Sequence, residues 1–228
     1  MRAAVIQSNY IPWKGYFDII NNCDVFVFHD DLQYTKNDWR NRNKIKTPSG
    51  PEWLTIPCGT NQNRLISEVQ INEKRWQKQH FEKIKQNYSK ANYWYFLESI
   101  MQDFLLDKKW DYLSDLNQYF IKKISLEIFN SKCDFIDSRT LKLTQKKSDR
   151  VLEICQKLKA DCYISGPSAV SYLEAGDFEK ENIKVTYFDY SDYPIYDQLW
   201  GPFSHEVSVI DLIANTGPLA KNFLKNRQ

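Results

Sequence analysis

The sequence predicts an α/β fold with a mainly parallel sheet of the nucleotide-binding type. Two short apolar runs lie near the amino terminus, at residues 3–6 and 25–28, and the second is rich in strand-forming side chains. Residues 17–22 suit a short helix, and both apolar runs end abruptly in polar residues. Strand, loop, helix and strand in this order form a βαβ unit, from which parallel sheets are built.

Polar side chains follow both predicted strands. Because the carboxyl ends of neighbouring parallel strands open into one crevice, these side chains are expected to share a ligand site. The expected members are Gln7, Asn9 and Tyr10 after the first strand, with Asp30, Asp31 and Gln33 after the second.

The next segment, residues 35–46 (TKNDWRNRNKIK), alternates basic side chains with amides around one tryptophan. A solvated loop is the simplest interpretation, but forked guanidinium groups and amides also suit the recognition of phosphates and hydroxyls. The turn at 47–51 and the run 53–57 predict a hairpin with 43–46 as its first strand. An extended segment would point its two arginines the same way. The candidate binding residues here are Lys36, Trp39, Arg40, Asn41 and Arg42.

The middle of the chain changes from strand to helix periodicity. Residues 66–71 alternate apolar and polar side chains, which predicts a half-buried strand. From residue 74 apolar side chains recur every four residues, which predicts an amphipathic helix, and His80 on its apolar face is interpreted as a packing residue. Two more helices are predicted at 93–106 and 113–129.

The last third returns to an α/β pattern. Strands are predicted at 135–136, 162–164 and 184–188, helices at 149–159, 169–173 and 207–214, and an aromatic turn at 189–196. We therefore expect one domain over residues 1–228, with a hairpin and helical insertion at about 37–130.

Composition excludes several classes of protein. The 31 Lys and Arg nearly balance the 29 Asp and Glu, and a formal charge of +2 gives no support for a nucleic-acid partner. No apolar run reaches the roughly 18 residues that a membrane span needs, and no signal core is present, so we expect no membrane insertion and a cytoplasmic location. The five cysteines lack paired spacing, and neither a disulfide framework nor a zinc site is expected.

Several separated motifs resemble the WbqC-like family of bacterial proteins. They are IQSNYIPWKGYF, VFHDDLQYTKNDWRNRNKIKT, WLTIPC, YISGPSAVSYL, Tyr196-Asp197-Gln198 and SVIDLIANTG. The resemblance covers nearly the whole chain, with Ser8 and His29 where proline and leucine are expected. It implies a product of a surface-polysaccharide (O-antigen) gene cluster that modifies an amino sugar. It also adds Tyr196 and Gln198 to the candidate substrate-binding residues.

The loop at 9–16 stands where nucleotidylyltransferases carry a proline and a pair of histidines that bind the triphosphate. Pro12 and Gly15 keep that spacing, but Trp13 and Tyr16 replace the histidines. This is compatible with a distant structural kinship, whereas conventional nucleotidyl transfer through the motif is not expected. The two aromatic side chains instead suit stacking on a sugar or a nucleobase.

The turn after the strand at 162–164 is a candidate anion site. Ser165, Gly166 and Ser168 offer backbone N–H groups and hydroxyls at the start of the predicted helix. An ordinary tight turn with Ser168 as the helix cap is equally compatible. Neither a P-loop nor a dinucleotide-binding fingerprint occurs.

Asp31 and Asp30 are the first candidates for catalysis. At a strand end they could act as a general base or bind Mg²⁺. Alternatively, one caps a turn and the other pairs with Arg40 or Lys36. His205, which precedes the last helix, is a third catalytic candidate.

Three hypotheses about function remain open. The first is a transferase that moves an acyl or aminoacyl group to the amine of a nucleotide-linked sugar. The second is a nucleotidyltransferase- or ligase-like enzyme that uses a nucleoside triphosphate. The third is a non-catalytic protein that binds a nucleotide-linked sugar. The expected partner is thus a small molecule, and the sequence indicates no particular cofactor, metal or oligomeric state.

Overall fold

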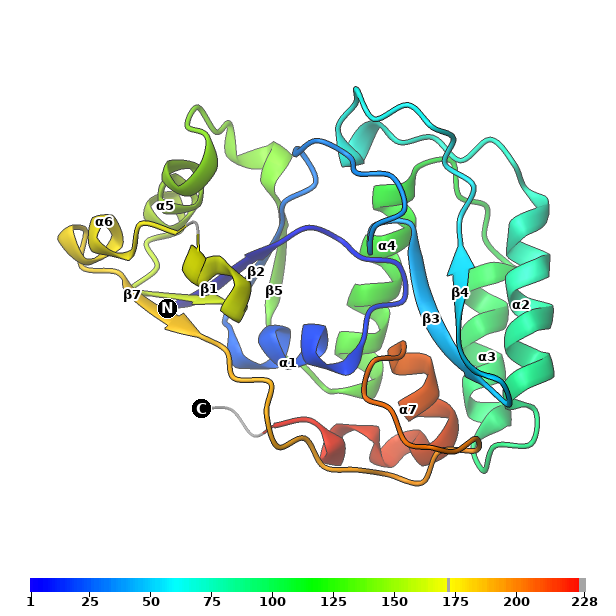
Figure 1. Ribbon diagram of the computed structural model, residues 1–228. Coiled ribbons are helices and arrows are strands. Elements are labelled where there is room, and N and C mark those ends of the chain that lie inside the picture. Colours follow the sequence, from blue (N-terminus) through cyan, green and yellow to red (C-terminus); the bar gives the residue numbers. More distant parts are fainter. Residues whose placement is uncertain (172, 226–228) are drawn as a thin grey trace.

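A parallel β-sheet forms the centre of the computed structural model, which describes residues 1–171 and 173–225 (Figure 1). In this part of the chain the sheet has five strands in the order β5-β2-β1-β6-β7, and all neighbouring pairs are parallel. The strands are β1 (Arg2–Ile6), β2 (Val25–Phe28), β5 (Asp134–Asp137), β6 (Cys162–Ser165) and β7 (Lys184–Tyr187). The predicted α/β fold with a mainly parallel sheet is confirmed.

The two faces of the sheet are covered by different helices, because side chains alternate along each strand. Ala3 and Val25 belong to the apolar cluster that includes side chains of α5 (Lys147–Leu158) and α6 (Ala175–Lys180). Their neighbours Ala4 and Phe26 belong to the larger cluster with α1 (Lys14–Asn22). Burial of both faces, at roughly 25 cal/mol per Å² of apolar surface, is the main source of stability.

A long connection joins β2 to β5 and contains a hairpin and a group of helices (Figure 1). Its elements are β3 (Arg42–Thr47), β4 (Gly50–Thr55), α2 (Arg75–Tyr88), α3 (Trp94–Leu105) and α4 (Leu113–Lys123). Near the carboxyl terminus, α7 (Val209–Thr216) packs against α3. The interpretation of residues 37–130 as an insertion into a single domain stays a prediction.

The hairpin and α2 form where the sequence pattern predicts them. The strands of the hairpin pair from Arg42 with Thr55 to Thr47 with Gly50. Gly50 has φ +106° in the turn, a conformation that favours glycine. On α2 the stripe of apolar side chains is buried, and His80 is buried with it: the stripe consists of Trp76, His80, Ile84 and Tyr88.

One predicted strand is wrong. Residues 66–71 form a short 3₁₀ helix at Ile66–Glu68 followed by irregular backbone. Val69 and Ile71 are buried, so the alternation of apolar side chains reflects packing of this segment rather than a place in a sheet. The carbonyl of Val69 accepts a hydrogen bond from the N–H of Leu113 at 2.9 Å, which docks the segment onto the start of α4.

Two predicted helices also differ from the structure. The helix predicted at 169–173 is a 3₁₀ helix at Pro167–Ser171, and the short α6 that follows was not predicted. The helix predicted at 113–129 is α-helical only to Lys123 and continues as a π-helix at Ile124–Ile128. Apolar spacing alone does not separate these segments from an α-helix, because the period of each differs from the α-helical period by less than about one residue per turn.

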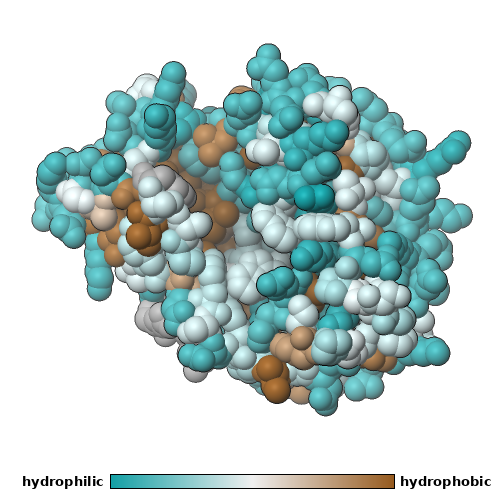
Figure 2. All heavy atoms as spheres, viewed as in Figure 1, coloured by the Kyte–Doolittle hydropathy of each residue, from teal (hydrophilic) through white to brown (hydrophobic). Residues whose placement is uncertain are grey.

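The surface is hollowed in the middle of the face shown in Figure 2. The hollow lies between the part of the molecule built by α5 and α6 and the part that contains the hairpin, and hydrophobic residues lie on its wall. Among the helices that the structure describes, none has both the length and the apolar character needed to cross a membrane.

Candidate functional site

The carboxyl edge of the sheet contains a topological switch point between β1 and β6. From β1 the sheet extends through β2 on one side, whereas from β6 it extends through β7 on the other. Open α/β sheets bind ligands at such points, because the loops leave the edge in opposite directions and a crevice forms between them. Here Gln7 follows β1 and Gly166 follows β6.

Arg40 reaches the end of β1 from the segment before the hairpin. Its guanidinium donates a hydrogen bond to Gln7 Oε1 and lies 3.7 Å from the Asp38 carboxylate. Burial lowers the pKa of Arg40, and the charge of Asp38 opposes that shift. The Gln7 carbonyl accepts a hydrogen bond from the Tyr16 hydroxyl at 3.0 Å. The segment before the hairpin thus folds back over the first strand and brings the predicted Gln7 and Arg40 together.

A cavity of about 400 Å³ lies between the loop after β1, the hairpin and the segment before α7. Its volume is within the range of small-molecule sites, roughly 300 to 1,000 Å³. Lys44 and Glu206 form an ion pair of 3.8 Å in its wall. Asn9 Oδ1 is buried and accepts no hydrogen bond from the described residues. The lining combines amides, indoles, a cation and a carboxylate: Asn9, Pro12, Trp13, Trp39, Asn43, Lys44 and Glu206.

Asn43 connects the hairpin to the loop after β1. Its Nδ2 donates hydrogen bonds to the carbonyls of Tyr10 at 3.1 Å and Ile11 at 3.0 Å. Ile11 has φ +35°, an unfavourable conformation for a β-branched residue, and it is fully buried. The hydrogen bonds and the packing therefore stabilise a strained turn that places Pro12 and Trp13 in the cavity wall.

The aromatic segment 189–196 supports the same wall. The Trp13 ring lies 5.0 Å from that of Tyr190 and 5.9 Å from that of Tyr193, both in edge contacts. Lys14 is buried beside them, and its Nζ donates a hydrogen bond to the Pro194 carbonyl at 3.1 Å. Burial lowers the pKa of Lys14 to about 8, and the charge of Asp18 opposes the shift. The segment is thus fixed against the start of α1.

Asp30 is fully buried and faces α4. Its carboxylate accepts hydrogen bonds from the backbone N–H of Ser8 at 2.7 Å, the Ser114 hydroxyl at 2.6 Å and Gln118 Nε2 at 3.0 Å. These bonds tie the ends of β1 and β2 to α4. Asp30 follows β2 at the carboxyl edge of the sheet, but it is not among the residues that line the cavity with Asn9, and its oxygens are occupied by donors of the protein itself. Its catalytic role stays a prediction.

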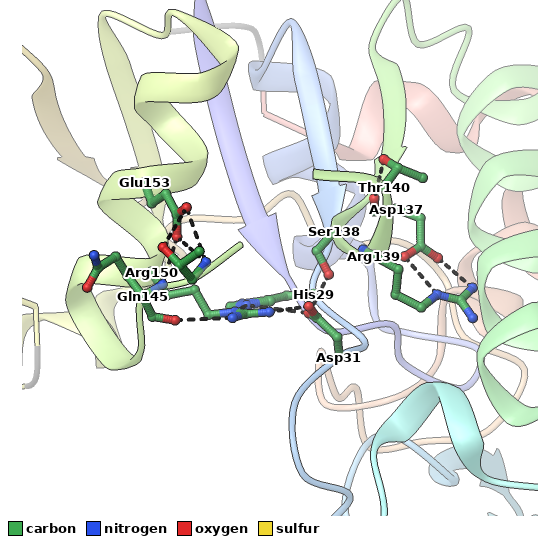
Figure 3. Close-up of polar contacts among 10 residues, drawn as sticks. His29, Asp31, Asp137, Ser138, Arg139, Thr140, Gln145, Arg150 and Glu153 are labelled. Atoms are coloured by element: carbon green, nitrogen blue, oxygen red, sulfur yellow. Dashed lines mark hydrogen bonds and ion pairs between the residues drawn. The ribbon is translucent and has the colours of Figure 1, made fainter. Parts of the chain in front are cut away.

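Asp31 faces α5, in the cluster drawn in Figure 3. Its carboxylate forms an ion pair with Arg150 and accepts a hydrogen bond of 2.5 Å from the Ser138 hydroxyl. Arg150 Nε donates to His29 Nε2 at 3.1 Å. Burial lowers the pKa of His29; the charge of Asp31 opposes this shift and that of Arg150 reinforces it. A neutral imidazole has a ring nitrogen that can accept this hydrogen bond from the guanidinium, whereas a protonated one does not.

Tyr10 and Asn41 are placed in the interior rather than in the cavity wall. The Tyr10 hydroxyl and His80 Nδ1 are hydrogen-bonded at 2.8 Å, and the Tyr10 side chain is fully buried. Asn41 Nδ2 donates to the Ile56 carbonyl at 3.0 Å. The expectation that Tyr10 lines the pocket is therefore corrected: the strained turn after β1 rotates its ring into the core.

Other residues predicted around the hairpin lie outside the cavity wall. Gln33 and Lys36 contact Gln62, Gln33 through its side chain and Lys36 through its backbone N–H. Arg42 stacks on Trp53, with its guanidinium carbon 4.2 Å from the ring centroid. Five binding residues were predicted in the basic segment, and the structure describes all of them. Of these five, Trp39 alone lines the cavity.

The predicted Tyr196 and Gln198 hold the segment before α7. The Tyr196 hydroxyl and Gln198 Nε2 each donate to Asp211 Oδ2 at 2.8 Å, and Asp211 is fully buried. Burial raises the pKa of Asp211, and these hydrogen bonds oppose the shift. His205 packs its ring 4.5 Å from that of Phe203, and burial together with the charge of Lys14 lowers its pKa. His205 is adjacent in sequence to Glu206 of the cavity wall.

The predicted anion site after β6 has a different structure from the one expected. Ser165 is buried, and its hydroxyl donates to the Tyr163 hydroxyl at 3.2 Å rather than to an external anion. A side-chain carbon at Gly166 would lie 3.5 Å from the Tyr190 hydroxyl, an ordinary van der Waals contact, so the aromatic segment passes beside this turn without requiring glycine there. Ser168 is exposed within the 3₁₀ helix, so it does not cap an α-helix.

Several residues of the site were not predicted as functional. Asn43 and Lys44 belong to the basic segment, and Glu206 follows His205, so each stood beside a predicted residue. Arg150 is not beside any predicted residue in the sequence. Its partner Asp31 is more than 100 residues away in the chain, so no local pattern could indicate their contact. Throughout the described residues, no group of three or more His, Cys, Asp and Glu side chains is placed to hold a metal ion.

These features define an α/β protein of the class in which ligands bind at the carboxyl edge of a parallel sheet. The chain belongs to the WbqC-like protein family, whose model matches residues 7–223. It is similar to the uncharacterized protein Rv1507c of Mycobacterium tuberculosis (strain ATCC 25618 / H37Rv), with 38% identity over 233 residues that cover 98% of this chain and 97% of that protein. No solved structure matches the chain with significance.

Proposed function

We propose that this protein is a transferase that moves an acyl or aminoacyl group to the amine of a nucleotide-linked sugar in O-antigen or other surface-polysaccharide synthesis. The observation that carries the proposal is the 400 Å³ cavity beside the switch point of the sheet. Membership of the WbqC-like family also supports a role in surface-polysaccharide synthesis. The cytoplasm, where nucleotide-linked sugars are made, is the location that this proposal requires.

The lining of the cavity suits a sugar with an attached phosphate. Asn9 and Asn43 offer amides for hydroxyl groups, and the Asn9 Oδ1 that lacks a protein donor is an acceptor for a ligand N–H or O–H. The indoles of Trp13 and Trp39 offer apolar faces for a pyranose or a base. Lys44 supplies a positive charge for a phosphate.

The transfer needs a group that takes a proton. The sugar amine attacks the acyl carbon, the bond from that carbon to the donor breaks, and the amine proton passes to a base. We propose Asp31 as this base, as the strand-end argument predicts, with Glu206 of the cavity wall as the competing carboxylate. Asp31 lies outside the cavity lining, so the substrate amine must reach it there and replace its ion pair with Arg150. Glu206 is already in the cavity wall and is exposed.

A non-catalytic protein that binds a nucleotide-linked sugar is the second candidate. This candidate is favoured because neither of the two adjacent carboxylates is free to act as a base. Asp30 accepts hydrogen bonds from the protein, and Asp31 forms an ion pair with Arg150. An enzyme that uses a nucleoside triphosphate has less support, because Tyr16 at the place of a phosphate-binding histidine is buried and donates to Gln7.

Binding and turnover of UDP-glucosamine separate these functions. Calorimetry should show binding, and mass spectrometry should show the mass of an added acyl or aminoacyl group when acyl-coenzyme A thioesters or aminoacyl donors are supplied. Trp13→Ala should weaken binding, whereas Tyr95→Ala, which removes an aromatic ring that is 85% exposed on α3, should not. Binding without transfer to any donor would favour the second candidate, and absence of binding to UDP- and dTDP-linked amino sugars would contradict both.

A further inference from the structure

The face of the hairpin beside the cavity carries two exposed indoles and two cations. Trp39 is 43% and Trp53 is 38% exposed, and their ring centroids are 5.4 Å apart. Lys44 stands directly opposite Trp53 in the hairpin register, with its Nζ 5.2 Å from the ring centroid, and the Arg42 guanidinium carbon lies 4.2 Å from the same centroid. A single exposed indole is ordinary, but two adjacent indoles with cations beside them form a contiguous patch of the kind that marks ligand sites.

We propose that this group, the hairpin platform of Trp39, Arg42, Lys44 and Trp53, binds the nucleoside diphosphate part of the substrate. The inference rests on the proposed function and extends it, because it assigns the nucleotide to the hairpin and leaves the sugar to the cavity. The indoles stack on the base, and the two cations contact the diphosphate.

The charges favour a nucleoside diphosphate over a neutral glycan. Arg42 forms no ion pair with any described residue, and its Nε is buried without a hydrogen-bond partner. Stacking on Trp53 fixes the plane of the guanidinium and leaves its edge free to donate to phosphate oxygens. Among the described residues Lys44 forms an ion pair with Glu206 alone, at 3.8 Å, and the Glu206 side chain is 84% exposed. A diphosphate can replace so exposed a carboxylate at little cost.

Continuity with the cavity gives the ligand its direction. Trp39 and Lys44 belong both to the platform and to the cavity lining, whereas Trp53 and Arg42 lie beyond it on the hairpin. A base on the indoles therefore places its diphosphate beside Lys44 and its sugar toward Asn9 and Asn43. With the base on the hairpin platform and the sugar in the cavity, the amine of the sugar lies next to the switch point of the sheet.

Fluorescence and calorimetry with UDP, dTDP, uridine and inorganic pyrophosphate test the platform. UDP should quench tryptophan fluorescence in the full chain, and Trp53→Ala should weaken UDP binding by about 10-fold, the effect of losing one stacked ring. Arg42→Gln should weaken UDP and pyrophosphate alike by about 10-fold or more, with a smaller effect at high salt. Tyr95→Ala and Arg75→Gln, on exposed parts of α3 and α2, serve as matched controls.

The outcomes separate this inference from the proposed function. Loss of UDP binding in Trp53→Ala and Arg42→Gln, with the controls unchanged, supports the platform even if no acyl transfer is found. UDP-glucosamine binding that both variants leave unchanged overturns the platform and leaves the proposed function standing. A full chain that binds neither UDP nor dTDP overturns the platform, and free glucosamine as the preferred ligand would then overturn the nucleotide part of the proposed function as well.

Discussion

The carboxylates of Asp30 and Asp31, which are neighbours in the chain, face opposite layers of the molecule. Asp30 accepts hydrogen bonds from Ser114 and Gln118 of α4, whereas Asp31 pairs with Arg150 of α5. Successive residues leave a strand on opposite sides, and this alternation continues past the end of β2. The two acids therefore do not form one catalytic pair, and their variants are expected to behave differently.

Asp31→Asn should lower kcat of the proposed transfer by at least about 100-fold, because the amide cannot take the proton of the attacking amine. Binding of UDP-glucosamine should change little. The ion pair with Arg150 is also lost, so thermal unfolding must show that the variant is folded at the assay temperature. Turnover at the wild-type rate would remove Asp31 from catalysis, and Glu206→Gln would then be the variant to measure.

Asp30→Asn should destabilise the fold by about 2 to 4 kcal/mol, because a buried anion that accepts several hydrogen bonds is replaced by a group that must also donate. The free energy of unfolding in urea measures this change. Asp107→Asn, at an exposed position after α3, is the matched control and should change stability by less than about 0.5 kcal/mol. Equal stability of the two variants would contradict a structural role for Asp30.

The positions of the sheet strands along the chain and the placement of the main helices follow from local patterns that the sequence displays. Residues 25–28 are apolar throughout because β2 is buried on both faces, and the spacing of Trp76, Ile84 and Tyr88 matches one face of α2. Such apolar patterns indicate which side chains are buried. They predict the wrong secondary structure where a segment buries alternate side chains without forming a strand. Val69 and Ile71 alternate like a strand, yet they are buried beside α4 without entering a sheet.

The candidate site is less accessible to sequence reasoning, because it depends on contacts between distant segments. The strand ends predicted that Gln7 and Asn9 share one ligand site. Asn9 lines the cavity, whereas Gln7 accepts a hydrogen bond from Arg40 and is outside that lining, and a ligand site that includes both stays a prediction. Glu206 enters the cavity from a segment more than 190 residues away from Asn9, and no local pattern marks that contact. Tyr10 shows the opposite error, since a strained turn carries a plausible binding residue into the core.

The buried pair of Tyr10 and His80 should make stability depend on pH. Burial lowers the pKa of His80 from 6.5 to about 4, the backbone of Thr55 opposes this shift and the charge of Lys83 reinforces it. As pH falls from 6.5 to 4, the unfolded chain binds a proton that the folded chain does not, so the free energy of unfolding falls, by roughly 3 kcal/mol in total.

His80→Gln isolates this dependence. Urea unfolding at intervals from pH 7.5 to pH 4 should show a shallower loss of stability in the variant than in the wild type. Asp18, whose pKa burial raises to about 6, changes stability in the opposite direction in both proteins and cancels from the comparison. Lys78→Gln, on the exposed face of α2, should leave the pH profile unchanged. Parallel profiles for His80→Gln and the wild type would contradict a neutral buried His80.

Gly15 of α1 should be needed for the shape of the cavity rather than for the helix. Alanine usually stabilises a helix relative to glycine, by roughly 1 kcal/mol. At Gly15, however, the added carbon would meet Cζ2 of the Trp13 indole and lie 2.6 Å from its Cη2, so the ring must leave its position in the cavity wall. Gly15→Ala should therefore weaken binding of UDP-glucosamine about as much as Trp13→Ala does, while the protein stays folded. Gly176→Ala in α6 is the matched control, because an added carbon there meets no neighbouring atom within 4 Å in the part of the chain that the structure describes, and the change should be neutral or stabilising. Calorimetry gives the two affinities, and near-ultraviolet circular dichroism reports the displaced indole; unchanged binding in Gly15→Ala would show that the position of Trp13 does not matter to the ligand.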